Sequence, residues 1–252
     1  MEYTDLIFDL YGTLVDIHTD ENDLVWEKTA IYFGFYGAHY TAAELRASFD
    51  SLLNEKEAEA GQNYEYFPDL PIEPVMAELF LRKGVKENTQ TLGKNAAQLF
   101  RISSMEYIRL YPHVREVLAA LREKGRRLWL LSNAQRVFTE YELRHLGLWD
   151  FFDGVYLSSD YGCRKPDIRF FHALLDGEHL DSANCLMIGN DRKTDIAGAK
   201  AAGLDTLYLH TNLTPDDQPA ADPDRFPSES TRGNWEWEGS DWQALAGVLL
   251  SM

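Results

Sequence analysis

Cysteine and basic residues are scarce in this chain. Cys163 and Cys185 are its only cysteines. Two thiols cannot form a disulfide framework, and their spacing matches no zinc motif, so we expect two reduced thiols. Lysine and arginine number 24 against 41 aspartate and glutamate residues, which gives a net charge of −17. Such a surface repels nucleic acid and anionic membranes, so neither is expected as a partner.

Long hydrophobic runs are missing as well. No stretch approaches the roughly 20 apolar residues that a membrane-spanning helix needs. Residues 1–5 lack the basic start of a secretion signal, so the cytoplasm is the expected compartment. Apolar residues nevertheless make up 45% of the 252 residues, which is enough for one large or two small folded domains.

Short, continuously apolar segments alternate with helical patterns over much of the chain. Because strands that are apolar throughout are typical of parallel sheets covered on both faces, we predict an α/β fold with a doubly wound, Rossmann-like parallel sheet. The active site of such a sheet lies at the carboxyl ends of its strands. The predicted strands are residues 6–8, 128–131, 155–157, 186–188 and 206–209.

Residues from about 20 to 108 have a helical pattern and no strand alternation. Thr41 and Glu44 form a capping box, and a further helix is expected over 89–104. We therefore predict a core domain of residues 1–16 and 110–252, interrupted by a helical domain of residues 17–109. Residues 211–233 are expected to form a surface loop, and Trp242 belongs to a predicted final helix.

Polar residues follow four of the predicted strands. A carboxylate at the end of a buried strand, such as Asp9, is costly unless it is used or paired. Each residue alone has a structural explanation, as a turn former, a helix cap or a solvated lysine. Their occurrence together, in order, favours an active site. The set is Asp9, Tyr11, Gly12 and Thr13, then Ser132 and Asn133, then Lys165, then Asn190, Asp191 and Asp195.

This set of motifs resembles that of the haloacid-dehalogenase-like (HAD) hydrolases. The segment from Asp9 to Thr13 is similar to the first family motif, Ser132 to the second, Lys165 to the third, and residues 189–195 to the fourth. The resemblance covers nearly the whole chain, and the helical insert looks like an α-helical cap of this family. It implies an enzyme that cleaves a small substrate under its cap, and it says little about which substrate.

The resemblance also implies a role for each residue. Asp9 would attack the substrate and form a covalent intermediate, which for a phosphate ester is an aspartyl phosphate. Ser132, Asn133 and the backbone at Gly12 and Thr13 would bind the phosphoryl group, and Lys165 would neutralise charge beside Asp9. Tyr11 takes the position of the general acid. Mg²⁺ is the implied cofactor, with Asp9, the Tyr11 carbonyl, Asn190, Asp191 and Asp195 as its candidate ligands.

The sequence departs from the family phosphatases at two positions, and these leave alternatives open. Phosphatases of the family carry aspartate where this chain has Tyr11, whereas family dehalogenases carry tyrosine. Phosphatases also carry aspartate where this chain has Asn190, so either Asn190 or Asp191 could bind the metal. A Mg²⁺-dependent phosphatase is the preferred interpretation, and a 2-haloacid dehalogenase is the first alternative. A weakly active protein that binds a phosphorylated ligand is the second.

Other positions weigh against the dehalogenase interpretation. The family dehalogenases need no metal, and their fourth-motif asparagine and a later tyrosine fall on Arg192 and Phe171 here. Their halide-binding cap arginine has no clear counterpart here, and Arg46 is a weak candidate for it. The sequence leaves the substrate and the oligomeric state open.

Overall fold

The computed structural model describes residues 3–59, 67–215 and 231–252. Its centre is a six-stranded sheet in the order β5-β4-β1-β6-β7-β8, and every neighbouring pair is parallel. This confirms the predicted α/β fold with a doubly wound parallel sheet. The strands are β1 (Asp5–Phe8), β4 (Arg127–Ser132), β5 (Gly154–Leu157), β6 (Cys185–Gly189), β7 (Asp205–His210) and β8 (Trp235–Glu238).

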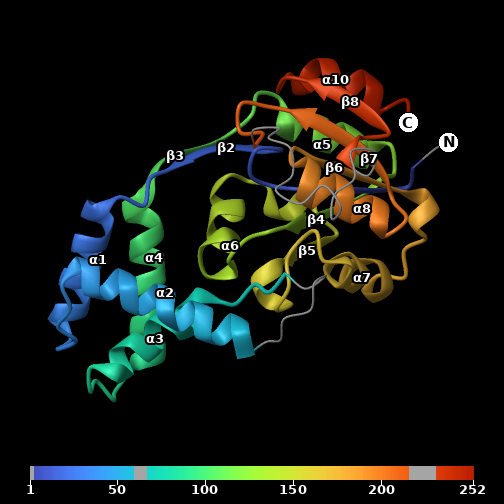
Figure 1. The fold of residues 1–252 in the computed structure, drawn as a ribbon. Coiled ribbons are helices and arrows are strands. Elements are labelled where there is room, and N and C mark those ends of the chain that lie inside the picture. The colour runs from blue at the N-terminus through green and yellow to red at the C-terminus, as the bar shows by residue number, and fades with distance from the viewer. Residues whose placement is uncertain (1–2, 60–66, 216–230) are drawn as a thin grey trace.

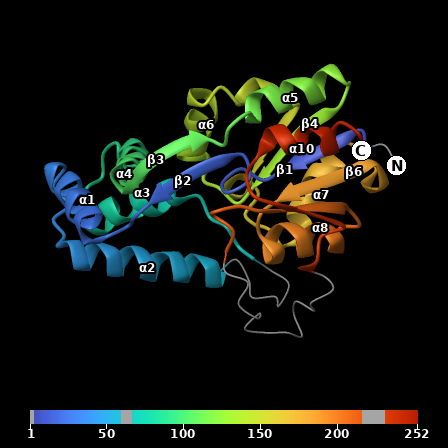
Figure 2. The same ribbon diagram turned by 90° about the horizontal axis from the view of Figure 1, so that it is seen from above.

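Helices cover both faces of this sheet, as Figures 1 and 2 show. On β1, Leu6 and Phe8 belong to one core cluster and Ile7 belongs to the other. The strands are apolar on both sides because both sides are buried. The first cluster includes residues of α5 (Val114–Glu123), α6 (Arg136–His145) and α10 (Trp242–Leu249), and the second includes residues of α7 (Ile168–Gly177) and α8 (Ala197–Ala201).

The insert forms a separate helical cap. Its helices are α1 (Asp23–Phe35), α2 (Ala42–Glu59), α3 (Ile72–Arg82) and α4 (Thr89–Ser104), and they share their own hydrophobic cluster. The capping box is present, because Thr41 Oγ1 accepts from the Glu44 amide and Glu44 Oε2 accepts from the Thr41 amide. The predicted helix over 89–104 is confirmed as α4.

An antiparallel ribbon joins cap and core. It consists of β2 (Val15–Thr19) and β3 (Met105–Leu110), and it lies between the two parts in Figure 1. The prediction that the region up to 108 has no strand was therefore wrong. Asp16 faces Arg109 across the ribbon, and the two form an ion pair at 2.7 Å, so polar residues occupy positions where an apolar pattern would have indicated a strand. Both predicted domain boundaries, at 16/17 and 109/110, fall within this ribbon. The division of the chain into these two domains stays a prediction.

The carboxyl-terminal part contains one strand that the sequence pattern did not indicate. β8 is an edge strand with the sequence Trp-Glu-Trp-Glu, and it pairs with β7. The final helix is confirmed as α10. Of the predicted loop 211–233, residues 216–230 lie outside the described residues. None of the helices in the described part of the chain is long and apolar enough to cross a membrane.

Candidate active site

Asp9 lies at the point where the sheet topology changes direction. The chain runs from β1 outward through β4 to β5 and then returns to β6 on the other side of β1. In open α/β sheets this switch point leaves a crevice at the carboxyl ends of the strands. Asp9 directly follows β1 and Asn190 directly follows β6, so both residues lie at this crevice. The Asp9 side chain is only 10% exposed.

The loop after Asp9 turns tightly back toward the cap ribbon. The amide of Val15 donates to the carbonyl of Leu10, and the amide of Gly12 donates to the carbonyl of Val15. Gly12 has φ +83°, and a Cβ at this position would lie 2.2 Å from Nδ2 of Asn190. Both the conformation and the close approach require glycine.

Lys165 connects the first and fourth motifs. Its Nζ lies 2.7 Å from Oδ1 of Asp9 and 2.6 Å from Oδ1 of Asp195, and it also donates to the Leu131 carbonyl at 2.8 Å. Its side chain is 1% exposed. Burial alone would lower the pKa of Lys165, but the carboxylates of Asp195 and Asp9 raise it above its ordinary value. Burial raises the pKa of Asp195 to about 7. Lys165 is therefore a buried cation beside Asp9.

The two oxygens of Asp9 have different environments. Oδ1 accepts from Lys165 and, at 3.2 Å, from the hydroxyl of Ser132. Oδ2 has one long contact, 3.4 Å, to the hydroxyl of Thr13. The carboxylate is therefore held through Oδ1, which leaves Oδ2 as the oxygen that can attack a substrate or bind a cation.

Asn133 supports the site from behind. Its Nδ2 donates to the carbonyl of Lys165 at 3.0 Å, and its Oδ1 accepts from the amide of Lys165 at 2.8 Å. Both polar atoms of the side chain are used on the backbone of the third motif. Sequence reasoning assigned Asn133 to substrate binding, and the structure adds that its side chain fixes the position of Lys165.

Asn190 and Asp191 occupy different environments. Nδ2 of Asn190 donates to the carbonyl of Leu213 at 3.1 Å, and Oδ1 of Asn190 lies 3.2 Å from the Thr13 hydroxyl. Asp191 caps the π-helical turn Arg192–Ile196, because its Oδ1 accepts from the amides of Lys193 and Thr194 at 2.7 and 3.1 Å. Asn190 therefore directs an oxygen toward the Thr13 hydroxyl, which also contacts Asp9, whereas one oxygen of Asp191 is already engaged by the backbone.

The side chain of Tyr11 forms its hydrogen bonds with α6. Its hydroxyl donates to Oε2 of Glu142 at 2.5 Å and lies 3.0 Å from Oγ1 of Thr139, and both of these residues belong to α6. Burial, together with the neighbouring Glu142 carboxylate, raises the pKa of Tyr11 above its ordinary value. The hydroxyl is therefore a protonated donor whose proton is directed at Glu142.

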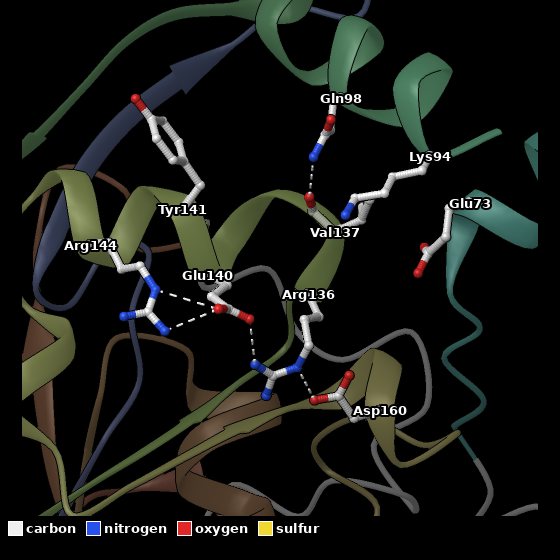
Figure 3. Close-up of a pocket in the computed structure, with 9 residues that line it drawn as sticks. All are labelled: Glu73, Lys94, Gln98, Arg136, Val137, Glu140, Tyr141, Arg144 and Asp160. Atoms are coloured by element: carbon white, nitrogen blue, oxygen red, sulfur yellow. Dashed lines mark hydrogen bonds and ion pairs between the residues drawn. The ribbon is translucent and has the colours of Figure 1, made fainter. Parts of the chain in front are cut away.

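A cavity of about 190 Å³ opens over these groups. Every predicted site residue except Gly12 and Thr13 lines it. The lining residues are Asp9, Tyr11, Ser132, Asn133, Lys165, Asn190, Asp191 and Asp195, together with Thr194, Leu213 and Pro215. A second cavity, of about 500 Å³, lies between α6 and the cap helices α3 and α4 and contains none of the motif residues (Figure 3). The smaller cavity is therefore the candidate active site.

The donor set of this cavity fits a hard divalent cation. Among the described residues, no three histidine, cysteine, aspartate or glutamate side chains are grouped as a metal site. Asp195 is paired with Lys165, and Asp191 caps a helical turn. The cavity-lining carboxylate and amide oxygens that accept from neither Lys165 nor a backbone amide are Oδ2 of Asp9, Oδ1 of Asn190 and Oδ2 of Asp191, and Tyr11 lines the same cavity. Mg²⁺ suits such a set, since it retains several waters and needs only one or two carboxylates.

The residues that would serve a dehalogenase lie elsewhere. Arg192 pairs with Glu236 at 2.9 Å, and its guanidinium lies 3.7 Å from the centre of the Tyr208 ring. Phe171 belongs to α7 and is fully buried in the core cluster that includes residues of α7 and α8. The Arg46 side chain is 53% exposed and lies 3.8 Å from Asp23, within the cap. None of the three lines the cavity over Asp9.

Sequence reasoning missed the loop that follows β7. Oγ1 of Thr211 donates to the carbonyl of Gly12 at 2.7 Å, and the carbonyl of Leu213 orients Asn190. These contacts join residues about 200 and 23 positions apart in the sequence. No signal in the sequence indicated them, because this segment has neither a motif nor a periodic pattern.

Comparison with known proteins agrees with this geometry. A family model described as haloacid dehalogenase-like hydrolase matches residues 6–203. A glyceraldehyde 3-phosphate phosphatase of Methanothermobacter thermautotrophicus is 34% identical over 107 residues, which cover 42% of this chain and 47% of the relative. The chain spans about half the length of the first curated relatives that it matches.

Solved structures share the fold at low sequence identity. A 2-haloacid dehalogenase of Pseudomonas syringae pv. Tomato DC3000 has a TM-score of 0.59 at 22% identity, with 86% of this chain and 92% of that chain covered. YfnB of Bacillus subtilis, solved bound to magnesium, has a TM-score of 0.55 at 19% identity, with 99% of each chain covered. The family model spans well over half of the chain, so this protein belongs to the haloacid dehalogenase-like hydrolases.

Proposed function

We propose that this hydrolase is a Mg²⁺-dependent phosphatase that acts on a small phosphorylated metabolite through an aspartyl phosphate on Asp9. One observation carries the proposal. The buried carboxylate of Asp9 is held through Oδ1 by Lys165 and Ser132, and Asp9 lines a small cavity whose other lining residues include Asn190, Asp191 and Asp195. The glyceraldehyde 3-phosphate phosphatase relative supports a phosphate ester as the substrate.

In the first step Oδ2 of Asp9 attacks the phosphorus atom. The bond from phosphorus to the leaving oxygen breaks, its electron pair stays on that oxygen, and the phosphoryl group is then bound to Asp9. Lys165 keeps Oδ1 in place and supplies a positive charge beside the phosphoryl oxygens. The hydroxyl of Ser132 and the backbone at Gly12 and Thr13 bind the group during transfer.

In the second step water attacks the phosphorus atom and breaks its bond to Asp9. The proton that this water loses passes to solvent and balances the one that the leaving oxygen takes up. Inorganic phosphate is released and the carboxylate is restored. Mg²⁺, when bound, would supply positive charge to the phosphoryl oxygens. Its proposed ligands are Asp9, the Tyr11 carbonyl and Asn190. Asp191 and Asp195 are assigned to supporting roles, since one caps a helical turn and the other pairs with Lys165.

The cap would cover the site during these steps and exclude bulk water. Because the curated relatives overlap this chain only in part, the particular metabolite is not assigned. The dehalogenase alternative has less support, since Arg192, Phe171 and Arg46 lie away from the cavity.

The test is turnover of a panel of phosphate esters with Mg²⁺ and with a chelator, alongside release of halide from 2-haloacids. We expect phosphate release that requires Mg²⁺. Asp9→Asn should reduce it by roughly 10³-fold or more while the protein stays folded, because an amide is a poor nucleophile. Halide release that persists in chelator would support the dehalogenase instead. Binding of phosphate esters without turnover would support the weakly active alternative.

A further inference from the structure

The cap contacts the core through a buried polar cluster that includes the first catalytic motif. We define the latch as Tyr11, Arg101, Thr139 and Glu142. Arg101 belongs to the last turn of α4 in the cap, and Thr139 and Glu142 belong to α6 in the core. Tyr11 lies two residues after Asp9, in the loop of the proposed nucleophile. Three separate segments therefore meet in one cluster.

Arg101 is fixed by several contacts at once. Its Nε donates to Oε1 of Glu142 at 2.7 Å, and its Nη2 donates to Oε2 of the same carboxylate at 3.0 Å. Its guanidinium also lies 5.3 Å from the centre of the Tyr11 ring. A two-pronged arginine–carboxylate pair is directional, so it sets orientation as well as distance.

The latch is buried, unlike the other arginine–glutamate pairs on α6. The side chains of Arg101 and Glu142 are 14% and 7% exposed. Arg144 and Glu140, on the same helix, pair at 3.0 Å but are 51% and 40% exposed (Figure 3). Removing one partner of a buried pair leaves the other charge without compensation, whereas exposed pairs contribute little. The latch therefore constrains the structure, and the exposed pair provides a matched control.

Glu142 transmits this constraint to the nucleophile loop. The same Oε2 that accepts from Arg101 also accepts from the Tyr11 hydroxyl. When the cap is docked, Glu142 is oriented by Arg101, and Glu142 in turn holds the Tyr11 side chain. The Tyr11 backbone lies in the turn that carries Asp9 and Gly12. A small displacement of such a group is enough to lower a rate about 10²-fold.

We propose that Arg101 is a positioning residue: by docking on Glu142 it fixes Tyr11, and through Tyr11 it holds the Asp9 loop in its reactive geometry when the cap is seated. This inference rests on the proposed function for its kinetic consequences only. It gives a structural role to Tyr11, which stands where the family phosphatases carry aspartate. An aspartate at position 11 would place a second carboxylate toward Glu142.

The test compares Arg101→Met with Arg144→Met, and adds Arg101→Lys and Tyr11→Phe. The first measurement is hydrogen exchange of the peptide that contains residues 9–15, in metal-free protein without substrate. We expect Arg101→Met and Tyr11→Phe to raise its exchange about tenfold or more, Arg101→Lys to raise it less, and Arg144→Met to leave it unchanged. Unchanged exchange in both Arg101→Met and Tyr11→Phe would overturn the proposal.

The second measurement is steady-state kinetics on whichever phosphate ester the wild type turns over. Arg101→Met should lower kcat about 10-fold to 100-fold with a smaller change in KM. The double variant Arg101→Met/Tyr11→Phe should be no slower than the slower single variant, because both act through one path. Additive losses, or a lower Tm with kcat retained, would show that Arg101 merely attaches the cap. If the wild type turns over no phosphate ester, the proposed function fails, and the exchange measurement still decides the inference.

Discussion

The side-chain amide of Asn190 donates to the carbonyl oxygen of Leu213 at 3.1 Å, and this bond determines which atom of the amide faces Thr13. With Nδ2 engaged by Leu213, Oδ1 is directed toward the Thr13 hydroxyl, which also contacts Oδ2 of Asp9. A carboxylate at position 190 would place an oxygen against the Leu213 carbonyl. The loop after β7 therefore explains why an asparagine suits a position where family phosphatases carry aspartate.

Asn190→Asp should lower the stability of the metal-free protein. The lost hydrogen bond and the opposed oxygens are expected to cost about 1–3 kcal/mol, which corresponds to a fall in Tm of roughly 2–10 °C. Added Mg²⁺ should recover part of this loss, because the new carboxylate attracts the cation. The measurement is Tm against Mg²⁺ concentration. Asp191→Asn, which preserves the helix cap, is the control and should leave the Mg²⁺ dependence unchanged. A larger effect in the control would assign the metal to Asp191.

Lys165→Met should both destabilise and inactivate the protein. Removing this cation leaves Asp9 and Asp195 buried beside each other, which is expected to cost about 3–5 kcal/mol. The loss should grow from pH 6 to pH 9. Burial raises the pKa of Asp195 to about 7 although Lys165 lowers it, so without the lysine the pKa of Asp195 rises further. The variant therefore continues to lose stability as the pH rises past 7, where this contribution in the wild type levels off.

Unfolding in denaturant at both pH values measures this effect. The double variant Lys165→Met/Asp195→Asn should regain part of the stability and none of the activity. Stability that is independent of the second substitution would argue against coupling between the two residues.

Asp69 should make stability depend on pH at the contact between cap and core. It accepts from Ser158 and from Gln135 Nε2, and both of these residues belong to the core. Burial raises the pKa of Asp69. A carboxyl whose folded pKa exceeds its unfolded value contributes stability at low pH that is lost as the pH rises through the folded pKa. Relative to Asp69→Asn, the wild type should therefore lose Tm as the pH rises above the unfolded pKa of an aspartate.

Glu55→Gln is a control in which the pH dependence of stability should have the opposite direction. The hydrogen bond from Arg82 lowers the pKa of Glu55, so its contribution appears as the pH rises above the unfolded value and is lost in acid. The Tm difference between the wild type and Glu55→Gln should therefore grow with pH. The same trend in both variants would mean that the dependence comes from other groups.

The sequence predicts best where one local pattern determines the structure. Strands β1, β4, β6 and β7 are apolar along nearly their whole length because both of their faces are buried, and each was predicted within one or two residues. Polar residues that end parallel strands necessarily share one edge of the sheet. The meeting of Asp9, Lys165 and Asp195 follows from that rule.

The features that could not be predicted depend on tertiary contacts. The β2–β3 ribbon is stabilised partly by Asp16 and Arg109, which resemble solvated residues in the sequence. Arg101 and Glu142 are ordinary helical residues until α4 and α6 are brought together. The role of Leu213 rests on a backbone carbonyl, and a carbonyl has no sequence signature. Pairing of charges across distant segments is set by the fold and not by local preference.

Tyr11 provides the sharpest test of the chemistry. A positioned general acid typically contributes roughly 10²–10⁴-fold to a rate. The Tyr11 proton is directed at Glu142, and burial raises its pKa, so the hydroxyl is poorly suited to protonate a leaving alcohol or to deprotonate water. We expect aryl and acyl phosphates, whose leaving groups need no proton, to react well and simple alkyl phosphates to react slowly. The measurement is kcat/KM across a series of esters with different leaving-group pKa values.

Two substitutions separate proton transfer from positioning at this residue. Tyr11→Phe removes the hydroxyl and keeps the ring, so it should slow aryl and alkyl esters by the same factor and leave their ratio unchanged. Tyr11→Asp introduces a group that can transfer a proton, so it should favour alkyl esters and bring the kcat/KM values of aryl and alkyl esters closer together. The smaller side chain leaves a void, which will lower Tm. If Tyr11→Phe selectively slowed alkyl esters, the hydroxyl would be the general acid after all, because only a proton donor discriminates between leaving groups in this way.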